Sequence, residues 1–102
     1  MVFMSATEIF NILRQNKIHL SRFGARRIGL FGSQVRDQAT CASDLDFLVE
    51  FVSGQKNYDN YIGLCFYLEE LFNKDIDLLT PESLSPHLKD RILGEVQYEN
   101  IQ

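Results

Sequence analysis

Two aspartates interrupt the most strand-like stretch of this chain, and they constrain its fold more than any other feature. The stretch reads SDLDFLVEF from residue 43 to residue 51, and a strand that served only a core would carry valine where Asp44 and Asp46 stand. Side chains two residues apart on a strand point to the same face, so the two carboxylates project side by side. A buried carboxylate is costly unless a positive group neutralises it. We therefore expect one face of this strand to meet solvent or a cation.

The pattern of apolar residues around that strand predicts an alternation of helices and strands. Apolar residues at helical spacing predict helices near residues 5–16 and 57–72, and runs rich in β-branched and aromatic residues predict strands at 27–31, 45–52 and 75–79. Residues 17–24 are expected to be a connector, and two short helical segments are expected after Pro81 and Pro86, the second ending near residue 93. This order predicts a single α/β (α+β) domain over residues 1–102, with helices packed on a small mixed β-sheet.

Charge and hydropathy narrow the classes of protein that fit. The chain has 102 residues and a formal net charge of −4, which argues against a protein that holds nucleic acid through a basic surface. It has no apolar run approaching the roughly 18 residues of a membrane span, and its first residues do not resemble a signal peptide. We therefore expect a cytoplasmic protein with no membrane contact and no direct nucleic acid binding.

A second acidic pair repeats the spacing of the first. Asp75 and Asp77 lie at the start of the strand predicted at 75–79, so two adjacent strands could bring three or four carboxylates onto one face. Like charges so close repel one another unless cations lie between them. Such a cluster of hard oxygen ligands suits Mg²⁺, which also binds water and substrate phosphate. The alternative is a solvated sheet face that carries a few acidic residues.

A Gly-Ser turn precedes the first acidic pair. Gly32 ends a predicted strand and permits close approach of the backbone, while Ser33 can cap a helical turn whose free amides attract phosphate. Arg36, one turn further on, could add positive charge. Taken alone, the dipeptide is a turn and a helix cap, and the chain has neither a Walker loop nor a G-x-G-x-x-G motif.

Together these residues resemble the signature of the DNA polymerase β-like nucleotidyltransferases, which is Gly-Ser, about ten residues, then Asp-x-Asp. The stretch RIGLFGSQVRDQATCASDLDFLVEF is similar to the minimal nucleotidyltransferases (MNT), and NKDIDLLTPESLSPHLKDRILGEVQYEN is similar to the end of those proteins. Two positions depart from the family pattern, because Asp37 and Asn73 stand where glycines are common. Asn73 tolerates left-handed backbone geometry, so we expect it to end the long helix as a glycine would.

The resemblance implies a nucleotidyltransferase (polymerase β palm-like) fold and a role for each matching residue. It implies that Asp44, Asp46 and Asp77 are catalytic and hold two Mg²⁺ ions. It also implies that Gly32, Ser33 and Arg36 bind the nucleotide, with Ser33 on the triphosphate. Asp75 is expected to be a solvated neighbour of this site.

The resemblance also implies a substrate and a partner. Small proteins of this family are commonly antitoxins, which use ATP to add AMP to a tyrosine of a HEPN-domain RNase toxin and so inactivate it. Two alternatives remain at this stage: an antitoxin of the same fold that neutralises its partner by contact alone, and a nucleotidyltransferase that acts on a small molecule.

Overall fold

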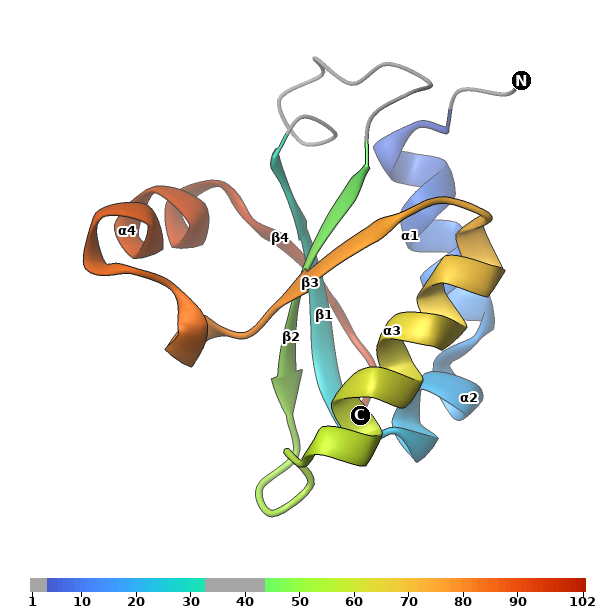
Figure 1. The fold of residues 1–102 in the computed structure, drawn as a ribbon. Helices are drawn as coiled ribbons and strands as arrows, with labels where there is room; N and C mark the ends of the chain where they lie inside the picture. Colours follow the sequence, from blue (N-terminus) through green and yellow to red (C-terminus); the bar gives the residue numbers. More distant parts are fainter. Residues whose placement is uncertain (1–3, 33–43) are drawn as a thin grey trace.

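Helices and strands alternate along the chain in the computed structural model, which describes residues 4–32 and 44–102 (Figure 1). The helices are α1 (Ala6–Gln15), α2 (Lys17–Arg22), α3 (Tyr58–Phe72) and α4 (Pro86–Glu95), with a 3-10 turn at Pro81–Ser83. The strands are β1 (Ala25–Phe31), β2 (Leu45–Phe51), β3 (Ile76–Leu79) and β4 (Gln97–Asn100). The predicted helices and strands are therefore all present.

The four strands form one mixed sheet in the order β3-β2-β1-β4. β1 runs antiparallel to both β2 and β4, whereas β2 and β3 are parallel. Parallel neighbours need a crossover connection, and α3 provides it between β2 and β3. The predicted α+β class with a small mixed sheet is confirmed.

Two elements correct the prediction from sequence. Residues 17–22 form α2 rather than a connector: the Asn16 side chain donates to the Ile12 carbonyl at 2.8 Å and ends α1, and the next helix begins at once with Leu20 fully buried. Residues 97–100 form β4, which has no apolar alternation because its residues are all polar or aromatic. Pairing with β1, rather than a local pattern, makes this segment a strand.

The two faces of the sheet are covered unequally, as Figure 1 shows with α4 on one side and α1, α2 and α3 on the other. The larger core lies under α1, α2 and α3 and contains alternate strand residues, namely Ile28, Leu30, Leu45, Phe47, Val49 and Leu78. The opposite face carries a small cluster in which Ile92 of α4 packs with Phe31 and Leu48. Much of that second face is therefore left for polar side chains.

Local signals set the ends of the crossover helix. The Asn57 side chain caps α3 by accepting the Asn60 N–H at 2.8 Å. At the other end, Asn73 has φ of 52°, which confirms the left-handed C-cap expected of it. None of the helices within residues 4–32 and 44–102 combines the length and the apolar character that a membrane span needs.

Candidate active site

The ends of three strands meet at one edge of the sheet. β1 ends there, and β2 and β3 begin there, since β1 and β2 are antiparallel and β2 and β3 are parallel. The register pairs the Cα of Phe31 with that of Asp46, and the Cα of Asp46 with that of Asp77. A backbone bond from the Leu45 N–H to the Asp75 carbonyl, at 3.2 Å, fixes the same register one step earlier. The structure thus brings Asp46 and Asp77 into adjacent positions, although they are 31 positions apart in the sequence.

Strand alternation places both carboxylates on the α4 side of the sheet. On β2, Phe47 belongs to the larger core and Leu48 to the small cluster, so Asp46 shares the face of Leu48. On β3, Leu78 belongs to the larger core, so Asp77 faces the other way and is exposed. Asp44 is exposed just before β2, and its even spacing from Asp46 is the one expected of a common face.

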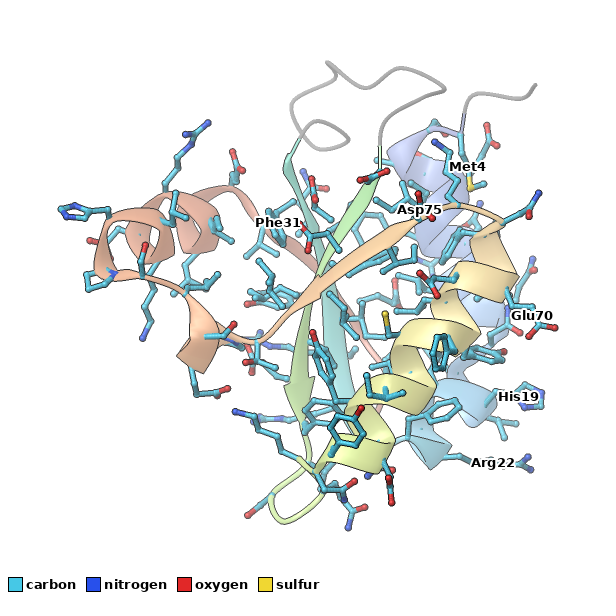
Figure 2. The ribbon with its side chains drawn as sticks, in the orientation of Figure 1. Met4, His19, Arg22, Phe31, Glu70 and Asp75 are labelled. Carbon is cyan, nitrogen blue, oxygen red and sulfur yellow. The ribbon has the colours of Figure 1, made fainter. Side chains whose placement is uncertain are left out.

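Asp75 lines a different hollow from Asp46. It is exposed at the position before β3, where Figure 2 labels it, and it lines a shallow depression with Glu69 and Asn73 at the end of α3. This position agrees with its expected role as a solvated neighbour.

Gly32 lies directly against Asp46. Its φ is +79°, in the left-handed region that favours glycine, and a Cβ built on it would lie 2.3 Å from Asp46 Oδ2. Its N–H donates to Glu95 Oε1 at 3.3 Å. Glycine is therefore required at position 32 for two reasons: it adopts the left-handed backbone conformation, and it leaves the space that the Asp46 carboxylate occupies. Ser33 and Arg36, the other two residues expected to bind the nucleotide, lie outside the described residues.

A cavity of about 190 Å³ opens beside Gly32 and Asp46, and we call it the α4 pocket. Its lining residues are Phe31, Gly32, Asp46, Leu88, Arg91, Ile92 and Glu95. Figure 2 shows Phe31 in the space between the sheet and α4. Reasoning from sequence did not include Arg91 or Glu95 in the site, because no local motif marks them. Only the packing of α4 against the sheet brings them to the strand ends.

The charge of Asp77 also acts on the other side of β3. Burial raises the pKa of Tyr61 on α3, with further electrostatic contributions from Cys65 and Asp77. The Tyr61 hydroxyl donates a hydrogen bond to the carbonyl of Leu78, the residue after Asp77. Burial likewise raises the pKa of the Cys65 thiol, with smaller contributions from Glu69 and Asp77. Both side chains are therefore held in their neutral forms beside β3.

The described residues fit a metal site in part. Asp46 and Asp77 supply two carboxylates on one face, and oxygen ligands of this kind suit Mg²⁺. Within residues 4–32 and 44–102, however, no three His, Cys, Asp or Glu side chains are grouped closely enough to hold an ion. The three-aspartate metal site therefore stays a prediction.

Comparisons with known proteins show the family to which the chain belongs. A family model described as a nucleotidyltransferase domain matches residues 12–98. Protein adenylyltransferase MntA of Thermococcus cleftensis is 39% identical over 99 residues, which are 96% of this chain and 99% of that protein. A solved structure assigned as a minimal nucleotidyltransferase superposes with a TM-score of 0.69 at 32% identity, and the match covers 86% of this chain and 93% of the other.

Two more distant solved structures share the fold. One is a toxin–antitoxin complex with AMP-PNP, which matches with a TM-score of 0.63 at 24% identity over 88% of this chain and 73% of the other. The other is a tri-AMPylated HEPN toxin of Shewanella oneidensis in complex with an MNT antitoxin, with a TM-score of 0.53 at 18% identity over 87% of this chain and 71% of the other. The family match spans all four strands except the last two residues of β4, and with it the strand ends that carry Gly32, Asp46 and Asp77. This chain therefore belongs to the nucleotidyltransferase domain family, and it is a nucleotidyltransferase.

Proposed function

We propose that this chain, as one nucleotidyltransferase domain, is a Mg²⁺-dependent protein adenylyltransferase that moves AMP from ATP to a tyrosine hydroxyl of a HEPN-type toxin and so acts as its antitoxin. The observation that carries the proposal is the register that pairs Asp46 with Asp77 beside the left-handed Gly32. The likeness over nearly the whole chain to a protein adenylyltransferase supports the reaction class. The shared fold of antitoxins in complex with toxins supports the kind of partner.

Each residue of the proposed site has its own role in the reaction. Asp44, Asp46 and Asp77 would hold two Mg²⁺ ions, which would stabilise the negative charge that develops on the α-phosphate and on the leaving pyrophosphate. Gly32, with its left-handed backbone, and Ser33 and Arg36 after it are proposed to bind the triphosphate. Asp77, which is exposed in β3, is proposed to accept the proton of the attacking hydroxyl.

The chemical step is a single displacement at phosphorus. The tyrosine oxygen forms a bond to the α-phosphorus, the bond from that phosphorus to the bridging oxygen breaks, and pyrophosphate leaves. The hydroxyl proton passes to Asp77 and from there to solvent. No covalent intermediate on Ser33 is needed, so the protein acts mainly by positioning groups and stabilising charge.

Substitution of the aspartates tests this proposal. Asp44→Asn and Asp46→Asn should abolish AMP transfer and leave the fold intact, because each change removes a negative charge from a cluster whose members repel one another. The assay is co-expression with the neighbouring gene, as the candidate toxin, followed by intact mass measurement of both chains. The toxin should gain mass in whole AMP units with the wild-type protein only.

The matched control is Asp59→Asn. Asp59 is exposed in the first turn of α3, away from the strand ends that carry Asp46 and Asp77. It removes the same charge and should leave transfer unchanged. Undiminished AMP transfer by Asp46→Asn would contradict the assignment of the site. Full neutralisation of an unmodified toxin by that variant would favour an antitoxin that acts by contact alone.

A further inference from the structure

Glu95 is the last residue of α4, and its carboxylate reaches the turn that follows β1. Its Oε1 accepts the Gly32 N–H at 3.3 Å, across 63 positions of sequence. α4 also packs on the sheet through Ile92, which is 7% exposed and lies against Phe31 and Leu48. Leu88, one turn before Ile92, is 49% exposed. The bond from Gly32 to Glu95 therefore adds a polar anchor at the end of a lightly packed helix.

Gly32 is confined from two sides. Glu95 holds its N–H, and the Asp46 carboxylate fills the space where a Cβ would be. Any rotation of the turn must therefore either break the bond to Glu95 or move the Asp46 side chain. The position of the proposed metal-binding carboxylate is thus coupled to a residue of α4.

Glu95 adds negative charge to the α4 pocket. A carboxylate beside Asp46 repels it and would repel a nucleotide phosphate as well. Arg91 lies one helical turn before Glu95 and lines the same pocket, so it offsets part of this charge. The hydrogen bond from the Gly32 N–H is a favourable contact of the Glu95 carboxylate in this pocket.

We propose that Glu95 is a positioning residue for AMP transfer, which holds the left-handed Gly32 turn against Asp46 by accepting the Gly32 N–H. The inference rests on the proposed function of the same site. The chemistry of the bond predicts that glutamine can replace glutamate, because its amide oxygen also accepts an N–H donor. Alanine cannot replace it.

The test compares Glu95→Ala and Glu95→Gln with Glu70→Ala. Glu70 is exposed on the outer face of α3, where Figure 2 labels it, so its removal changes the net charge equally without touching the α4 pocket. Two quantities are measured on each purified chain: hydrogen exchange of the Gly32 amide by NMR, and the Kd for a non-hydrolysable ATP analogue with Mg²⁺ by calorimetry. Thermal melting shows that each variant is folded.

Glu95→Ala should lose protection of the Gly32 amide and bind the analogue about tenfold more weakly, as expected for loss of one hydrogen bond to a charged group. Glu95→Gln should keep both properties within about twofold, as should Glu70→Ala, since the acceptor is retained or untouched. Unchanged Gly32 protection in Glu95→Ala overturns the inference, as does a Glu95→Gln protein that binds as weakly as Glu95→Ala. A wild-type protein that binds no nucleotide contradicts the proposed function instead, and the exchange measurement then still decides whether Glu95 holds Gly32.

Discussion

Replacement of Gly32 by alanine should disturb the candidate site, because the new Cβ would overlap the Asp46 side chain. The new Cβ would lie 2.3 Å from Oδ2, 3.1 Å from Cγ and 3.4 Å from Cβ of Asp46. Aspartate is too short to escape this overlap by a small change at its tip. Either the turn shifts away from β2 or the Asp46 carboxylate rotates out of its place beside Asp77.

The backbone and the contact contribute separately to the expected loss of stability. The left-handed conformation at φ +79° costs about 1–2 kcal/mol for a residue with a Cβ. Overlap with a neighbouring side chain adds roughly 1–3 kcal/mol where the surroundings hold firm. Gly54 isolates the first contribution, because its φ is +83° and a Cβ there would meet nothing within 4 Å.

The measurement is urea unfolding of the wild type, Gly32→Ala and Gly54→Ala, together with AMP transfer to the toxin. Gly54→Ala should lose about 1–2 kcal/mol of unfolding free energy and keep full transfer. Gly32→Ala should either lose more unfolding free energy than Gly54→Ala, if Asp46 stays in place, or lose transfer with little extra instability, if Asp46 rotates away. A Gly32→Ala protein that matches Gly54→Ala in stability and transfers AMP at the wild-type rate would refute the proposed coupling of Gly32 to Asp46.

Two further predictions concern the stability of the fold. Asn73→Gly should raise the unfolding free energy and Asn73→Ala should lower it by about 1 kcal/mol, because the C-cap of α3 has φ of 52°; the reverse order in thermal melting would contradict this. The ion pair of Arg27 Nη2 with Glu50 Oε2, at 2.7 Å, should make the cost of Arg27→Gln depend on pH. The hydrogen bond from Arg27 holds the pKa of Glu50 below its ordinary value of 4.5, so this stabilisation is present above pH 4.5 and is lost as the pH falls through the lower value of the folded state. The difference in unfolding free energy between wild type and Arg27→Gln, about 1 kcal/mol at pH 7, should therefore shrink in acid, and a difference that stays constant with pH would contradict the role of the pair.

Sequence periodicity predicted the elements that have a strong local pattern. The helix α3 and the strands β1, β2 and β3 each bury apolar residues at helical or alternating spacing. Such a pattern can be recognised from residues that are close together in the sequence. α2 and β4 were missed because their local signals are weak. α2 is only six residues long, and β4 carries Gln97, Tyr98, Glu99 and Asn100 with no apolar alternation.

The sequence by itself also determined that Asp44 and Asp46 have the spacing of one strand face, and that a glycine precedes them at the end of a strand. It could not determine what lies opposite those residues. Strand register places Asp77 next to Asp46, and the return of the chain through α4 brings Glu95 to the Gly32 N–H and Arg91 to the same pocket. Contacts between residues that are distant along the chain depend on pairing and packing of whole elements, and local periodicity carries no information about which elements meet. Local sequence therefore determines which residues are acidic and which strand face they share. The site that they form with α4 exists only in the folded chain.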